Sequence, residues 1–144
     1  MLRIALLALL LLITTAVHAE DRKYIVASPQ SNLPFSNGVI VGDTLYIAGH
    51  LGLEAQTGKP PADAEEEAKL VMDAVKKTVE DAGMTMSDIV MIQVHCPDLS
   101  LYGTFNKVYR TYFQDAFPAR AFLGSGKLLR DARFEVLGIA VRRK

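Results

Sequence analysis

Apolar and polar residues alternate over several short stretches of the chain, and apolar residues recur every three or four positions over two longer ones. Alternation is typical of strands, whereas the wider spacing is typical of helices. A Gly42-Asp43 pair between two β-rich runs also indicates a hairpin. The strands predicted in this way are residues 23–27, two runs within 38–49, 88–96, 120–125 and 132–141.

Two helices are predicted between these strands. The first begins after Asp63, which can cap it, and ends before Gly83; Glu66 completes the capping pattern. The second runs from about residue 98 or 100 to Phe113. Its apolar stripe consists of Leu101, Phe105, Val108 and Tyr112. The order β-β-β-α-β-α-β-β predicts an α+β fold with one mixed six-stranded sheet and both helices on one face.

The last predicted strand is apolar on both of its faces. Even-numbered residues from 134 to 140 share one face, and odd-numbered residues from 135 to 141 share the other. Two helices can cover only one side of the sheet, so we expect the other side to meet another subunit. The pattern therefore predicts a homo-oligomer.

The N-terminal segment has the features of a signal peptide. Arg3 supplies a positive charge, residues 4–13 are an unbroken apolar run, and Val17-His18-Ala19 fits a cleavage site. A helix of about ten residues spans only about 15 Å, which is half of a bilayer core. We therefore expect a signal peptide at residues 1–19, cleaved after Ala19, and a mature domain at residues 20–144 that is periplasmic or secreted and has no membrane anchor.

Charge and cysteine content narrow the function classes. Loss of Arg3 would leave 15 basic and 16 acidic residues, a balance that argues against the broad basic face of a nucleic-acid-binding protein. The single cysteine, Cys96, cannot form an internal disulfide, and the sequence shows no zinc-ligand spacing. His95 and Cys96 are consecutive strand residues, so they point to opposite faces and cannot act as base and nucleophile.

Two charged residues stand where core residues are expected. Arg120 follows Pro118-Ala119 at the start of one strand, and Glu135 lies in the last strand. A guanidinium can hold a carboxylate with two parallel hydrogen bonds, and a carboxylate on an apolar face must find a cation or a rim. The residues leave two interpretations open: an internal or interfacial ion pair between Arg120 and Glu135, or a ligand site that uses both.

Several motifs together resemble those of the RidA family, the YjgF-type reactive intermediate deaminases. They are "LPFSNGVIVGDTLYIAGHLGLEAQTGKPPAD", "NKVYRTYF", "FPARAF" and "ARFEVLGIAVRR", in the family's order and spacing from about residue 25 to 142. The resemblance implies a chorismate-mutase-like fold, assembled as a homotrimer with active sites between subunits. It also implies hydrolysis of small 2-enamino and 2-imino acids to 2-keto acids and ammonia, without a metal or organic cofactor.

The resemblance also assigns roles to individual residues. Arg120 matches the arginine that binds the substrate carboxylate, and Glu135 matches the glutamate that positions or activates the attacking water. Gly49 matches the glycine whose backbone faces the ligand, and Asn106 the helix asparagine near the site. Both charged residues are then expected to face one cleft.

Four expected substrate-binding positions differ from the residues common in the family. Phe35 stands in place of tyrosine, Ala48 in place of serine, His50 in place of glutamine, and Phe122 in place of cysteine or another smaller residue. The expected consequences are lost hydrogen bonds and a cleft narrowed by Phe122. The sequence therefore supports an exported 2-imino-acid deaminase, with a non-catalytic binder of small keto or imino acids as the alternative.

Overall fold

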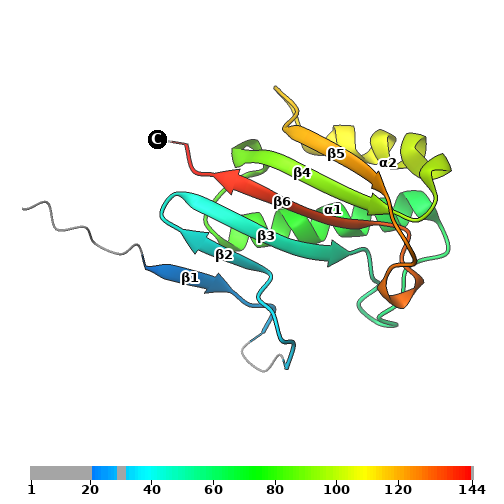
Figure 1. Ribbon diagram of the computed structural model, residues 1–144, viewed down its shortest axis with the longest axis horizontal. Helices are drawn as coiled ribbons and strands as arrows, with labels where there is room; N and C mark the ends of the chain where they lie inside the picture. Colours follow the sequence, from blue (N-terminus) through cyan, green and yellow to red (C-terminus); the bar gives the residue numbers. More distant parts are fainter. Residues whose placement is uncertain (1–20, 29–31, 144) are drawn as a thin grey trace, which may run out of the picture.

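The computed structural model describes residues 21–28 and 32–143, so the predicted signal peptide at residues 1–19 lies outside the described residues. Six strands form one sheet in the order β1-β2-β3-β6-β4-β5 (Figure 1). β4 and β5 run parallel, and the other neighbouring strands run antiparallel. The strands are β1 (Arg22–Ile25), β2 (Gly38–Val41), β3 (Thr44–Leu51), β4 (Ile89–Cys96), β5 (Ala119–Gly124) and β6 (Glu135–Val141). The predicted mixed six-stranded sheet is confirmed.

Both helices lie on one face of this sheet, behind the strands in Figure 1. The longer helix, α1 (Ala64–Asp81), begins as predicted: the Asp63 carboxylate accepts a hydrogen bond from the Glu66 N–H at 2.8 Å. Gly83 follows its end with a positive φ of 69°, which glycine adopts without strain. In the described part of the chain, no helix is both long and apolar enough to cross a bilayer.

The second helix is shorter than predicted. α2 (Tyr102–Tyr109) is flanked by two 3-10 turns, η2 (Leu99–Leu101) and η3 (Arg110–Tyr112). Its buried side chains, Phe105, Val108 and Tyr109, pack toward the sheet. Two further 3-10 turns precede strands β4 and β6; they are η1 (Met86–Asp88) and η4 (Leu129–Asp131).

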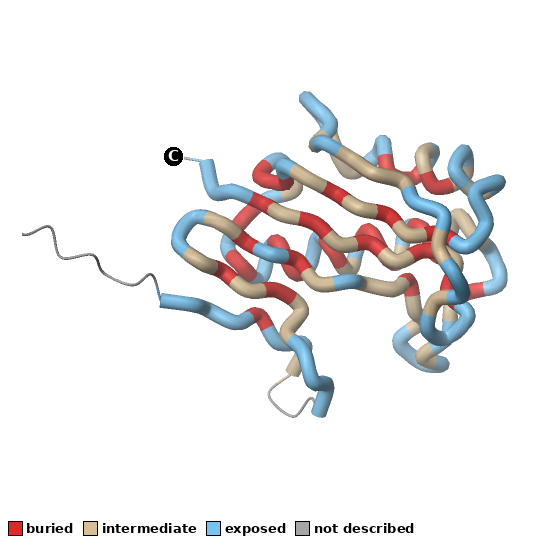
Figure 2. Tube along the Cα trace, in the orientation of Figure 1, coloured by how far each residue is buried: buried red, intermediate tan, exposed pale blue. Residues whose placement is uncertain are grey.

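The two faces of the sheet differ in burial. Along β4 and β6, buried residues alternate with half-buried ones (Figure 2). The buried set, which includes Ile92, Val94 and Val136, packs under the helices. The other set lies on a face that no described helix covers, and Tyr46 on this open face is 52% exposed. The helix-covered face therefore holds the core, while the open face stays apolar and uncovered.

A bulge in β3 changes which side chains reach each face. Ile47 pairs with Gly138 and His50 pairs with Val136, so Ala48 and Gly49 together oppose one residue of β6. The bulge turns His50 toward the helices, because directly paired residues share a face and Val136 is buried. Strict alternation along the strand would have placed His50 on the same face as Ala48.

A buried ion pair anchors the start of β6. Glu67 of α1 is fully buried, and its carboxylate accepts hydrogen bonds from the Arg133 N–H at 2.6 Å and the Arg133 Nε at 2.5 Å. It also accepts one from the Phe134 N–H at 3.2 Å. Arg133 in turn donates to the carbonyl oxygens of Ala62, at 2.8 Å, and Pro61. This network joins α1, the loop before it and β6, and so places Glu135 in its strand.

Candidate functional site

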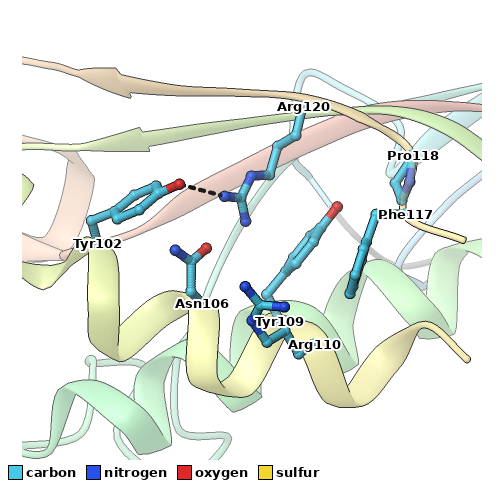
Figure 3. A pocket seen from close by; sticks show the side chains of 7 residues that line it. All are labelled: Tyr102, Asn106, Tyr109, Arg110, Phe117, Pro118 and Arg120. Carbon is cyan, nitrogen blue, oxygen red and sulfur yellow. Dashed lines mark hydrogen bonds between the residues drawn. The ribbon is translucent and has the colours of Figure 1, made fainter.

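Arg120 lies in a pocket between the edge strand β5 and helix α2 (Figure 3). Its guanidinium carbon is 4.5 Å from the centre of the Tyr109 ring, a distance typical of a cation–π contact. Arg120 also donates a hydrogen bond from Nη2 to the Tyr102 hydroxyl at 3.3 Å. The pocket has a volume of ≈ 300 Å³ and is lined by Tyr102, Asn106, Tyr109, Arg110, Phe117, Pro118 and Arg120.

The pocket is positively charged. Its lining includes two arginines and no aspartate or glutamate among the described residues. The pKa of the Tyr102 hydroxyl is lowered, first by a hydrogen bond with Asn106 and then by the charge of Arg120. Burial raises the pKa of Tyr109 to about 12, and its hydroxyl has no hydrogen-bond partner among the described residues. These groups suit an anion, and the Arg120 guanidinium suits a carboxylate in particular.

Glu135 lies on the open face of the sheet. It pairs with His95 of β4 on one side and with Leu51 of β3 on the other, and these three residues share that face. A Cβ atom added to Gly49 would stand 2.2 Å from Glu135 Oε1, so the Gly49 backbone directly faces the carboxylate. Gly49 and Glu135 are therefore neighbours within one chain.

Arg120 and Glu135 do not share a cleft within one chain. Arg120 pairs with Ile92, whose side chain is buried under the helices, whereas Glu135 pairs with half-buried His95 on the open face. Strand β4 also lies between β5 and β6. The expectation that both charges face one cleft is wrong for a single protomer. Their partners on β4, Ile92 and His95, point to opposite faces of the sheet, and paired residues share a face. The same geometry excludes an ion pair between them within a protomer.

Two expected site residues point into the fold. The His50 Nε2 is 2.9 Å from the Thr78 hydroxyl of α1, and burial lowers the pKa of this histidine. The Phe122 ring packs 5.0 Å from Tyr102 and 5.6 Å from Phe105, between ring centres. Phe122 is not among the residues that line the Arg120 pocket, although its ring centre is 5.9 Å from the Arg120 guanidinium carbon, and the expected narrowing of the cleft stays a prediction. His50 likewise lies away from the face that holds Glu135.

The remaining expected residues divide between the two regions. Asn106 lines the Arg120 pocket, as the resemblance implies. Ala48 belongs to the β3 bulge beside Gly49, and its N–H donates a hydrogen bond to the Asn37 carbonyl at 2.9 Å. Phe35, in the loop before β2, is 55% exposed. The Asn37–Ala48 bond ties this loop to the bulge.

The aromatic lining of the pocket was missed from the sequence. Asn106 lies four residues after Tyr102, three before Tyr109 and four before Arg110. This spacing puts all of them on one helix face, so the signal was present once Asn106 had been chosen. Phe117 and Pro118 stand three and two residues before Arg120.

The cysteine behaves as a structural residue. Cys96 is buried, its thiol lies 3.0 Å from the Asp98 carbonyl, and burial raises its pKa. His95 points to the opposite face, so the expected separation of this pair is confirmed. Within the described ranges, no cluster of three or more His, Cys, Asp or Glu side chains could hold a metal ion.

Known proteins resemble the chain over nearly all of the described region. The model of the family described as Endoribonuclease L-PSP matches residues 25–142. The 2-iminobutanoate/2-iminopropanoate deaminase of Escherichia coli strain K12 is 34% identical over 119 residues, covering 81% of this chain and 93% of the relative. The mouse protein of the same name is 35% identical over 116 residues, which cover 80% of this chain and 86% of the mouse protein.

Solved structures agree with the sequence comparisons. E. coli TdcF with bound serine superposes with a TM-score of 0.77 at 32% identity, covering 84% of this chain and 100% of that one. The YjgF gene product of E. coli also superposes with a TM-score of 0.77, at 34% identity. This match covers 84% of this chain and 99% of that one. The family match, the relatives and these two structures lead to one conclusion: the chain belongs to the RidA/YjgF family.

Proposed function

We propose that the protein hydrolyses small 2-imino and 2-enamino acids to 2-keto acids and ammonia. The observation that carries this proposal is the Arg120 guanidinium, held over the Tyr109 ring in an open pocket that no described carboxylate neutralises. Such a group can bind a substrate carboxylate through charge-assisted hydrogen bonds worth about 1.5–3 kcal/mol each. Relatives that are 34% and 35% identical bear the name 2-iminobutanoate/2-iminopropanoate deaminase, which supports the same reaction class.

The proposed active site needs two copies of the chain. Arg120 lies at the sheet edge on the helix side, and Glu135 lies on the open, apolar face, so one protomer cannot bring them together. If the open face of one copy packs against the β5 edge of the next, Glu135 of one chain approaches Arg120 of its neighbour. A head-to-tail contact of this kind closes into a ring, and a homotrimer is the ring that the family resemblance implies.

Glu135 would manage protons in this site. Water adds to the carbon of the protonated imine, forming a C–O bond while the π electrons of the C=N bond move to nitrogen. Glu135 takes the proton that the water loses and returns it to the amino nitrogen. Glu135 then takes the hydroxyl proton as the carbonyl forms and the C–N bond breaks, which releases the 2-keto acid and ammonia. Arg120 holds the carboxylate throughout, so that the imine carbon stays within reach of the water.

We also propose that this reaction takes place outside the cytoplasm. The proposal rests on the positive, apolar and small-residue pattern of residues 1–19. N-terminal sequencing of protein recovered from the periplasm or the medium would test it. A chain that begins at Glu20 supports cleavage after Ala19, and a chain that still begins at Met1 or Leu2 contradicts it.

A coupled assay tests the reaction itself. An amino-acid oxidase generates 2-iminopropionate in place, and its disappearance is followed with and without the protein. We expect wild type to accelerate the loss, and Arg120→Ala to lower kcat/KM about a hundredfold, with partial recovery in Arg120→Lys. Arg22→Ala, at an exposed position on β1, is the matched control. No acceleration by wild type, or full activity in Arg120→Ala, contradicts the proposal.

Mixing two inactive variants tests the shared site. Chains with Arg120→Ala and chains with Glu135→Gln are unfolded together and refolded as a mixture. If the site is built from two neighbouring copies, about a quarter of the interfaces then hold both an intact Arg120 and an intact Glu135. Activity should return to about a quarter of the wild-type value. A site contained within one chain would stay inactive in every mixture.

The alternative is a binder of small keto or imino acids without turnover. It is favoured by Phe35 and Ala48, since neither residue has a hydroxyl to hold a water beside Glu135. Calorimetry with 2-ketobutyrate separates the two functions when it is paired with the coupled assay. Binding without acceleration supports the binder, and binding with acceleration supports the deaminase.

A further inference from the structure

The Arg120 pocket contains a second guanidinium that binding of a single carboxylate does not use. Arg110, at the start of η3, lines the same pocket. Its guanidinium carbon is 5.7 Å from the centre of the Phe117 ring. Within residues 21–28 and 32–143, Arg110 forms no ion pair with an acidic residue. A small pocket with two arginines and no acidic lining residue has an uncompensated charge of two.

Both positive charges act on the same part of the pocket. The pKa of Tyr102 is lowered by its hydrogen bond with Asn106, then by the charge of Arg120, and to a smaller extent by the charge of Arg110. Figure 3 shows Arg120 reaching toward Tyr109 from the strand above, and Arg110 next to Tyr109 on the helix below.

The rings between the two arginines form an apolar wall. The Tyr109 and Phe117 rings are stacked, with centres 6.1 Å apart and planes inclined by 22°. Arg120 lies over Tyr109, and Arg110 lies over Phe117. The pocket thus offers two cations and a short hydrophobic surface formed by the rings that they contact. A small acid with two carboxylates suits such a pair of cations.

We infer that the preferred substrates are 2-imino acids with a second carboxylate, and that Arg110 binds this second group. The inference rests on the proposed function for its reaction and on the two-arginine pocket for its substrate class. Arg120 holds the carboxylate beside the imine carbon, and the side-chain carboxylate reaches Arg110. A small aliphatic imino acid leaves Arg110 unpaired, so it gains one ion pair fewer on binding.

Competing imines test this preference. 2-Iminosuccinate and 2-iminopropionate are generated by the corresponding amino-acid oxidases, and kcat/KM is measured for each. We expect wild type to favour the diacid about three- to tenfold, because a partly exposed charge pair contributes modestly. Arg110→Gln should remove this preference by lowering kcat/KM for 2-iminosuccinate about three- to tenfold more than for 2-iminopropionate, and Arg110→Lys should restore part of it. Arg130→Gln, at an exposed position beside Gly58, is the control.

Binding of the products gives a readout that does not depend on turnover. Calorimetry compares 2-oxosuccinate with 2-oxobutanoate on wild type and on Arg110→Gln. Tighter binding of the diacid that disappears in the variant supports the inference, even if neither imine is hydrolysed. Equal affinities in wild type, or equal losses for both acids in Arg110→Gln, overturn it. Hydrolysis of 2-iminopropionate without any diacid preference would overturn this inference alone and leave the proposed function intact.

Discussion

The two faces of the sheet treat charged residues in opposite ways. On the helix-covered face, the buried carboxylate of Glu67 is fully paired by the Arg133 side chain and two backbone N–H groups. On the open face, Glu135 is half-buried among apolar residues and forms no ion pair within the described residues. The first charge is satisfied by the fold itself, whereas the second depends on what covers that face.

This difference separates stability from activity. A buried carboxylate that loses its partners destabilises the fold, so Glu67 and Arg133 belong to the structure. In the proposed function, Glu135, whose carboxylate lies against the Gly49 backbone, takes part in the chemistry instead. Substitutions in the buried Glu67–Arg133 network should therefore change the free energy of unfolding. Substitutions on the open side should change assembly or turnover.

The largest effect is expected at the buried carboxylate. Glu67→Ala leaves Arg133 and two backbone N–H groups without their acceptor, which should lower the free energy of unfolding by about 3–5 kcal/mol. Urea unfolding at a fixed protein concentration measures this loss. Glu65→Ala is the control, since its ion pair with Lys107 is exposed and should contribute only about 0.2–1 kcal/mol. Similar losses in the two variants would refute the assigned role of Glu67.

A charge on the open face should next disrupt assembly. Ile139→Lys places an ammonium on the apolar surface that we expect another copy to cover, at a cost of about 1.5–3 kcal/mol per copy. Light scattering should then report a smaller particle, while circular dichroism stays that of a folded chain. Leu129→Lys, at a position 77% exposed in η4, should leave assembly unchanged. A wild-type protein that is already monomeric would contradict this prediction.

A smaller effect is expected beside Glu135. In Gly49→Ala the new methyl would collide with the carboxylate, which must turn away from its present position. Since a displacement of about 1 Å can cost up to a hundredfold in rate, we expect kcat to fall about ten- to hundredfold, with little change in KM. Gly103→Ala adds a methyl with nothing within 4 Å and serves as the matched control. Unchanged kcat in Gly49→Ala would argue against a role for Glu135.

The smallest effect concerns His50, whose pKa is lowered by burial. The unfolded chain binds a proton near the ordinary histidine pKa of about 6.5, and the folded chain binds it only at lower pH. Stability from the neutral ring is therefore fully present above about pH 6.5 and is lost as the pH falls through the folded pKa. Urea unfolding between pH 8 and 5 should show this loss. In His50→Gln the free energy of unfolding should change less with pH over this range. An equal pH dependence in both proteins would contradict a buried, neutral His50.

The secondary structure was largely predictable because its signals are local. The cap at Asp63, the glycine after α1 and the alternation in β4 and β6 each depend on residues close together in the chain. The early end of α2 was not predictable in this way. Its apolar stripe continues through Tyr112, yet the last turn tightens into η3.

The site was only half predictable for a geometric reason. The family motifs identified Arg120, Glu135, Gly49 and Asn106, and the structure places two of them in each of two regions. Motifs report which residues are present but not which face each occupies. The β3 bulge shows the problem at His50: one extra residue reverses the face, and only pairing with Val136 reveals it.

The sequence by itself determined the order of the elements, their approximate bounds, the family and the apolar character of both faces of β6. These properties follow from spacing and composition over a few residues. Tertiary structure alone decided that Glu67 meets Arg133, that His50 turns inward, and that Arg120 and Glu135 lie on opposite faces. Each of these outcomes depends on the register of strands that are distant in the chain. A shift of one residue in that register moves a side chain to the other face, and no local pattern records it.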